Sequence, residues 1–154
     1  MSLFSKLNLK VAIIEDVQPH QNADKLYVLK INCGEPRQLV AGMKPFYAPE
    51  QLKGKHIIIV SNLKPAILRG VESQGMLLAA QIGDVVKVLE APKSPAGEQV
   101  FVEDEEIGSE QITIDDFAQI KLMTKGKIAV FEAKPLQTKK EKVFVDIGDN
   151  ATIR

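Results

Sequence analysis

The segment Asn62–Ala80 (NLKPAILRGVESQGMLLAA) brings together side chains that are suited to binding a nucleic acid. Positive charges that attract phosphates come from Lys64 and Arg69, and groups that can hydrogen-bond to sugars or base edges come from Asn62, Ser73 and Gln74. Met76 adds a flexible apolar surface against which a base can pack. The same residues also fit an ordinary hairpin connection between two buried strands, so the segment by itself leaves both interpretations open.

Side chains suited to catalysis or to metal binding form no recognisable constellation. Ser73 lacks the Gly-X-Ser-X-Gly context of a hydrolase nucleophile, and no phosphate-loop or dinucleotide pattern occurs. The two histidines, His20 and His56, and the single Cys33 do not have zinc-ligand spacing, and we interpret both histidines as structural. We therefore predict a binding protein that is not itself an enzyme and that has no cofactor or metal site.

The elements that must position these residues are short strands separated by turn residues. Strands are expected at residues 9–17, 26–31, 37–41, 56–61, 75–80 and 85–89, and a helical turn at residues 48–52. This order favours a barrel or a sandwich over alternating strands and helices. We predict a single small barrel over residues 4–103, an acidic linker at residues 103–106 and a separate extension over residues 104–154.

Charge is unevenly distributed along a chain whose formal net charge is zero. Residues 1–80 carry 10 basic and 6 acidic side chains, residues 81–120 carry 2 and 10, and residues 121–154 carry 8 and 4. Because a phosphate responds to the local field, the basic first 80 residues are the expected binding face. The single cysteine and the lack of a signal peptide or a long apolar run predict a cytoplasmic protein with no membrane span.

The last third of the chain partly repeats its beginning. Phe117–Glu132 (FAQIKLMTKGKIAVFE) is similar to Phe4–Glu15 (FSKLNLKVAIIE), and Lys142–Gly148 is similar to Tyr27–Gly34. The two phenylalanines are 113 positions apart and the two glycines 114, so the register nearly holds. An internal repeat indicates that one structural unit occurs twice, although two unrelated hairpins with the same alternation would give the same pattern.

Three motifs in order resemble the tRNA-binding domain family. The string NLKPAILRGVESQGMLLAA resembles the signature of that family, and His20–Tyr27 (HQNADKLY) resembles its HPNADKLY, with Gln21 in place of proline. Leu39–Gly42 (LVAG) resembles its IVSG, and the helical turn Phe46–Leu52 matches as well. The resemblance covers residues 4–103. The family includes the C-terminal domain of many methionyl-tRNA synthetases, a stand-alone structure-specific tRNA-binding protein and the endothelial monocyte-activating polypeptide II group.

The resemblance implies an all-β fold, a five-stranded oligonucleotide-binding (OB) barrel with a small C-terminal β-rich extension. It also implies structure-specific, largely sequence-independent binding of tRNA, by a free factor or by an appended domain of an aminoacyl-tRNA synthetase. The RNA contacts that it implies are Asn62, Lys64, Arg69, Ser73, Gln74 and Met76, with Lys25 and Arg37 as weaker candidates. Few aromatic residues are present, 5% of the chain, so recognition by shape and backbone is expected rather than stacking on successive bases.

The resemblance also implies a role for the extension in the subunit arrangement. Stand-alone members are homodimers, whereas the polypeptide II group has a C-terminal module that imitates the missing partner. Residues 104–154 occupy that position, which predicts a monomer with a built-in pseudo-dimer interface and leaves a homodimer as the alternative. The Lys-rich part of the extension is also a candidate for enlarging the RNA surface. The competing function is a protein-interaction or chaperone module on the same barrel, because a related secretion-chaperone family shares the fold but lacks the full signature.

Overall fold

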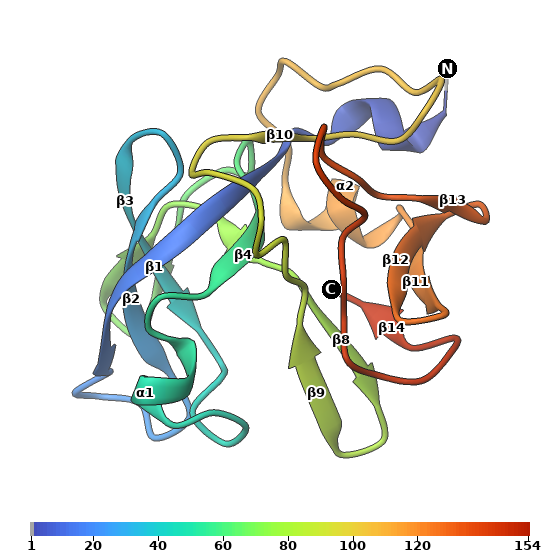
Figure 1. Ribbon diagram of the computed structural model, residues 1–154. Helices are drawn as coiled ribbons and strands as arrows, with labels where there is room; N and C mark the ends of the chain where they lie inside the picture. Colours follow the sequence, from blue (N-terminus) through green and yellow to red (C-terminus); the bar gives the residue numbers. More distant parts are fainter. Residues whose placement is uncertain (1) are drawn as a thin grey trace.

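The computed structural model describes residues 2–154 and shows an OB-type barrel (Figure 1). Nearly all of its regular secondary structure consists of β-strands. A 3-10 helix, η1 (Leu3–Lys6), precedes the first sheet, whose strand order is β3-β2-β1-β4-β7, with β10 also paired to β1. The strands of this sheet are β1 (Leu9–Pro19), β2 (Tyr27–Asn32), β3 (Pro36–Ala41), β4 (His56–Val60), β7 (Met76–Leu77) and β10 (Gln99–Val100). The short helix α1 (Pro49–Leu52) connects β3 to β4.

A second sheet combines strands from the middle and the end of the chain. Its order is β13-β12-β11-β14-β8-β9, and a separate two-stranded hairpin pairs β5 with β6. The elements are β5 (Ala66–Leu68), β6 (Val71–Ser73), β8 (Ala79–Ile82), β9 (Val85–Val88), α2 (Ile114–Ala118), β11 (Leu122–Lys125), β12 (Ile128–Phe131), β13 (Lys134–Pro135) and β14 (Thr152–Ile153). The hairpin β8–β9 lies within the predicted barrel segment but pairs through β8 with β14, so the two predicted parts of the chain share a sheet.

Strand β4 explains how the two parts share their interior. Its side chains from Ile57 to Val60 are all buried, although successive side chains of a strand point to opposite faces. Ile57 and Ile59 belong to the barrel core together with Leu29 and Leu39. Ile58 and Val60 belong instead to a second core that includes residues of the extension. The continuous apolar run therefore marks a strand that is covered on both faces.

The second core lies between the barrel and the extension. From the barrel it includes Leu9, Val11, Ile58 and Val60, and from the extension Phe117, Leu122, Phe131, Val143 and Ile153. The rings of Phe4 and Phe131 contact each other with their centroids 5.2 Å apart. Burial of apolar side chains stabilises a fold by roughly 1.5–3 kcal/mol for each fully buried large residue. The extension is thus an integral part of the folded unit rather than a tail.

The partial repeat is visible in local structure at its beginning and not at its end. Phe4 lies in η1 and Phe117 in α2, and a strand starts five residues later in both cases, at Leu9 and at Leu122. By contrast, residues 142–148 form only isolated bridges, whereas the corresponding segment near Tyr27 is the regular strand β2.

The expected strands all occur, with small differences in their ends. The segment 75–80 is divided into β7 and β8, because the strand leaves one sheet and enters the other at Leu78. Strands β5, β6 and β10 were not predicted from the sequence. No helix of residues 2–154 is long and apolar enough to cross a membrane.

Candidate nucleic-acid interface

The signature segment contains a protruding hairpin instead of an irregular loop. Strands β5 and β6 pair Ala66 with Ser73 and Leu68 with Val71, and a two-residue turn of Arg69 and Gly70 connects them. Both turn residues have positive φ, 53° and 88°, which suits the right-handed twist of a tight hairpin and favours glycine at the second position. All residues of β5 are exposed, so the hairpin presents Arg69 and its neighbours to solvent.

Ser73 and Gln74 close the barrel between this hairpin and β3. The Ser73 side chain is only 4% exposed; its hydroxyl accepts the Val40 N–H at 2.9 Å and donates to the Gly75 carbonyl oxygen at 2.9 Å. The Gln74 Oε1 accepts the Gln38 N–H at 2.9 Å, and the Gln74 N–H donates to the Gln38 carbonyl oxygen at 2.8 Å. These bonds replace a regular ladder at the place where the sheet meets itself. The structure therefore gives both side chains a framework role.

Arg37 holds the two ends of the signature segment together. Its Nη1 donates to the carbonyl oxygens of Ser61, at 2.7 Å, and of Gln74, at 3.2 Å, while Nε forms an ion pair with Glu35 at 3.4 Å. The Arg37 side chain is 21% exposed. Its charge can still act on a nearby phosphate, but its Nη1 donors are used within the protein.

Asn62 connects the signature segment to the beginning of the barrel segment and to the extension. Its Nδ2 donates to the carbonyl oxygens of Lys6, at 2.9 Å, and Glu110, at 2.8 Å, and its Oδ1 accepts the Asn8 N–H at 3.1 Å. The Lys64 N–H also donates to the Ile112 carbonyl oxygen at 2.8 Å. Residues 110–112 of the extension are therefore fixed against the signature segment, through the Asn62 side chain and the Lys64 N–H.

The candidate residues with exposed functional groups are Lys25, Lys64 and Arg69. Lys25 lies in the loop before β2, Lys64 just after β4, and Arg69 at the tip of the hairpin. The Arg69 Nη2 donates to the Asn22 carbonyl oxygen at 3.0 Å, which brings the hairpin tip against the loop that contains Lys25. These two loops are far apart in sequence, and the fold brings Arg69 against the loop that contains Lys25.

An apolar groove runs beside Lys64. A cavity of about 350 Å³ is lined by Lys64, Leu68 and Met76 from the signature segment and by Thr113 and Ile114 from the extension. The Ile114 side chain is 54% exposed, and Met76 is half-buried. Sequence reasoning included Met76 but missed Thr113 and Ile114, because nothing in the sequence indicates that the extension returns to the signature segment.

His20 is a further residue whose role only the structure defines. Its side chain is 5% exposed, and Nε2 lies 3.1 Å from the Leu68 carbonyl oxygen at the end of β5. Its Nδ1 accepts the Asn22 N–H at 2.9 Å. The structural interpretation of His20 is confirmed: it links the loop before β2 to the hairpin. We call the bonds that His20 and Arg69 form in this way the hairpin clamp.

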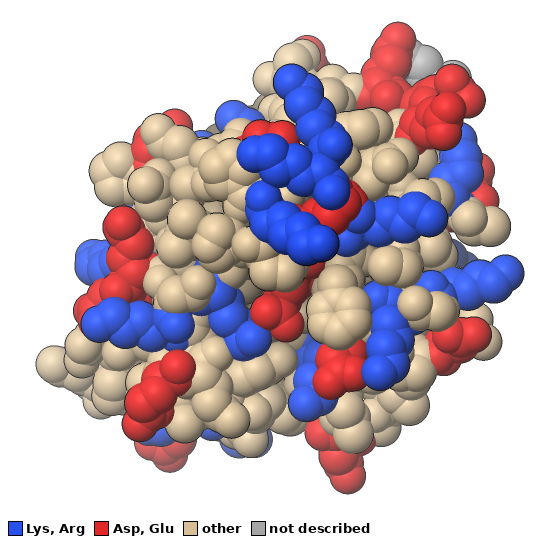
Figure 2. Space-filling model, viewed as in Figure 1, with Lys and Arg blue, Asp and Glu red and all other residues tan. Residues whose placement is uncertain are grey.

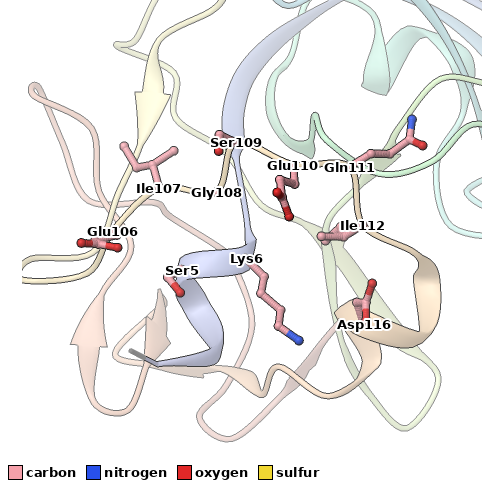
Figure 3. Close-up of a pocket in the computed structure, with 10 residues that line it drawn as sticks. All are labelled: Ser5, Lys6, Glu106, Ile107, Gly108, Ser109, Glu110, Gln111, Ile112 and Asp116. Carbon is pink, nitrogen blue, oxygen red and sulfur yellow. The ribbon is translucent and has the colours of Figure 1, made fainter.

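A second concavity has a different character (Figure 3). It lies between η1 and residues 106–112 of the extension and has a volume of about 430 Å³. Lys6 lies on one side of it, and Glu110 and Asp116 are among the residues around it. Its acidic side chains repel phosphates, so we do not assign RNA to it. Among residues 2–154, no three acidic, histidine or cysteine side chains are grouped so as to hold a metal ion.

Comparison with known proteins assigns the barrel segment to a family. Residues 9–99 match the family model described as "Putative tRNA binding domain". The chain belongs to the tRNA-binding domain family. It is 56% identical over 87 residues to the methionine–tRNA ligase of Pyrococcus furiosus, a match that covers 56% of this chain and 12% of the ligase. The matched segment thus corresponds to a small part of that enzyme.

Solved structures extend the similarity beyond the barrel. The C-terminal domain of Plasmodium vivax p43 superposes with a TM-score of 0.92 at 28% identity, covering 98% of both chains, so its fold includes the extension. A MetRS-related protein of Pyrococcus horikoshii and the CsaA chaperone protein of Picrophilus torridus both give TM-scores of 0.59. They are 37% and 32% identical, and each match covers 62% of this chain and 91% or 92% of the other. The family model that matches describes a tRNA-binding domain, which agrees with the prediction that this chain is not itself an enzyme.

Proposed function

We propose that this chain binds folded tRNA through the cations around the signature hairpin, with little regard to nucleotide sequence. The proposal is carried by the apolar groove that contains Met76 and is lined by the exposed Lys64, together with the hydrogen bond that joins Arg69 at the hairpin tip to the loop of Lys25. Exposed lysine and arginine side chains attract phosphates without reading sequence, and an apolar groove can take an unstacked base. Family membership supports tRNA as the ligand.

The remaining predicted contact residues have a different part in this proposal. Asn62, Ser73, Gln74 and Arg37 use their polar groups within the protein, so we propose that they hold the binding surface in shape. Their replacement would weaken RNA binding through the framework. Replacement of Lys64 would weaken it by removing charge, and replacement of Arg69 by removing charge together with its bond to Asn22.

Titration of tRNA over a salt series tests the proposal. Lys64→Ala and Arg69→Ala should each make the negative slope of log K against log salt shallower, by about 0.7–0.9 for each lost phosphate contact. Lys53→Ala, which removes an exposed charge next to α1, is the matched control and should leave the slope unchanged. Equal slopes for wild type, Lys64→Ala and Arg69→Ala would exclude this binding surface.

A protein-interaction or chaperone function is the second candidate, and the similarity to the CsaA chaperone protein favours it. That function would use apolar contacts, which are insensitive to salt. A chaperone would suppress aggregation of an unfolded test protein equally well in wild type and in the Lys64→Ala Arg69→Ala double variant. Loss of tRNA binding together with retained suppression in the double variant would separate the two activities.

We further propose that the protein is a monomer whose extension occupies the place of a second subunit. The extension covers apolar side chains of the barrel, among them Leu9, Val11 and Ile58, which would otherwise be exposed. Sedimentation should give a monomer at micromolar concentration, and a stable dimer would contradict the proposal. The relationship to methionyl-tRNA synthetases supports a synthetase as a protein partner and the cytoplasm as the site of action.

A further inference from the structure

A second basic surface lies on the extension, apart from the signature hairpin. Lys139 and Lys140 lie in a tight turn in which the Thr138 N–H donates to the Glu141 carbonyl oxygen at 2.8 Å, and Lys142 follows directly. Lys93 belongs to the neighbouring loop of the barrel. All four lysines are exposed, and we call this group the basic turn. Figure 2 shows basic side chains gathered over the C-terminal segment that crosses the middle of the view in Figure 1.

Glu141, the one acidic residue within the turn, is directed toward the barrel. Its Oε2 accepts the Lys93 N–H at 2.7 Å and the Ser94 hydroxyl at 2.7 Å. The buried hydroxyls of Ser94 and Thr138 also lie 2.8 Å apart, which fixes the turn to the barrel loop. The carboxylate is thus used to anchor the turn, while the ammonium groups remain at the surface.

The ammonium groups of the basic turn are free to bind an anion. Within residues 2–154, none of them forms an ion pair or a side-chain hydrogen bond, whereas the nearby Lys55 is paired with Glu90 at 2.9 Å. Four like charges held close together repel each other, and a partner with several phosphates relieves that repulsion. Lysine contacts phosphate as a point charge, which agrees with binding that does not depend on sequence.

The basic turn and the signature segment lie at opposite ends of β4. The His56 Nδ1 is 2.7 Å from the Ser94 carbonyl oxygen, which places the turn at the first residue of β4, and Asn62 follows its last residue. Six residues of extended chain span roughly 20 Å. That distance is about twice the Debye length of 8–10 Å at physiological salt, so the two surfaces act on different phosphates.

We propose that the basic turn is a second phosphate-binding surface that contacts another part of the same tRNA. This inference rests on the proposed tRNA binding and extends it from the barrel to the extension. The shared core and the sheet formed by β8 and β14 hold the two surfaces at a fixed distance, which suits a ligand recognised by shape.

A salt series with the full chain and a transfer RNA transcript tests the basic turn separately. The Lys139→Ala Lys140→Ala Lys142→Ala variant should bind more weakly at low salt, and its negative slope of log K against log salt should be shallower than that of wild type. For each lysine that contacts a phosphate, the ratio of wild-type to variant affinity should fall about 3-fold between 50 and 200 mM salt, or roughly 20- to 40-fold for all three. The matching triple arginine variant keeps the charges and should keep the slope.

Two controls separate the possible outcomes. A Lys44→Ala Lys53→Ala Lys125→Ala variant removes the same charge from other exposed positions and should bind like wild type. If wild type binds no tRNA, the proposed function fails. A different result is that wild type binds tRNA, Lys64→Ala weakens this binding, and the basic-turn variant keeps the wild-type slope. That result refutes only the second surface, and an acidic protein then becomes the alternative partner of its lysines.

Discussion

Replacing His20 should loosen the signature hairpin while leaving the barrel folded. The hairpin has two strands only, and such hairpins are marginally stable in water without further support. The His20 Nε2, 3.1 Å from the Leu68 carbonyl oxygen, supports the hairpin near its tip, and the His20 Nδ1 holds Asn22 at 2.9 Å. Each bond contributes about 1 kcal/mol, so His20→Ala should lower the free energy of unfolding by about 2–3 kcal/mol, lost packing included.

Two variants distinguish the two halves of the His20 contact. In His20→Asn, the side-chain oxygen can still accept the Asn22 N–H, as asparagine does in turns, but it cannot reach Leu68. Hydrogen exchange of the β5 and β6 amides should therefore become about 5-fold faster in His20→Asn as well as in His20→Ala, which corresponds to about 1 kcal/mol. Only His20→Ala should also disturb the loop at Asn22.

The consequence for RNA binding follows from the population of the ordered hairpin. If binding needs the hairpin in place, a cost of 1–2 kcal/mol weakens tRNA affinity by at most roughly 5- to 30-fold and leaves the salt slope unchanged, because no cation is removed. Wild-type hairpin exchange rates in His20→Asn would refute the clamp. A lower salt slope in either variant would show that His20 does more than position the hairpin.

Three further predictions concern the attachment of the extension. Asn62→Ala removes three hydrogen bonds and should lower the free energy of unfolding by about 1–3 kcal/mol in a denaturant titration, and an unchanged midpoint would contradict its bridging role. A Cβ on Gly108 would lie 2.3 Å from the Lys6 carbonyl oxygen, so Gly108→Ala should cost about 1–3 kcal/mol and speed proteolysis of the linker; wild-type resistance would argue against close docking. The backbone and side-chain hydrogen bonds of Thr113 lower the pKa of Asp116, so this carboxylate stabilises the fold above about pH 4 and the contribution is lost as pH falls below that value. Asp116→Asn should therefore make acid unfolding less steep, and identical acid profiles would exclude this contribution.

Several features of this protein could be derived from its sequence because they depend on local patterns. Alternating apolar residues and turn residues predicted strands β1 to β4, and the three ordered motifs indicated the family and its barrel. Residue type within the signature segment also selected Lys64 and Arg69, and the family resemblance added Lys25; all three are exposed. The similarity between the segments at Phe4 and Phe117 indicated that a strand follows each phenylalanine, and the structure adds a short helix before each strand.

The roles of the remaining residues were decided by tertiary structure. Residue type suggested that Asn62, Ser73 and Gln74 contact RNA, but contacts that are distant in sequence direct their polar groups to Lys6, Val40 and Gln38. A polar side chain satisfies whichever partner the fold brings near, and sequence spacing does not reveal that partner.

The division of the chain at residue 103 shows the same limit for domain organisation. Composition and the family pattern separate a barrel segment from an extension, yet β8 pairs with β14 and both faces of β4 are buried. The sequence determined which segments are strands and which family the barrel belongs to, since both depend on patterns of neighbouring residues. Only the tertiary structure decided that the extension completes the second core and the groove beside Met76. The physical reason is that strands distant in sequence pair where this buries apolar faces that would otherwise contact water.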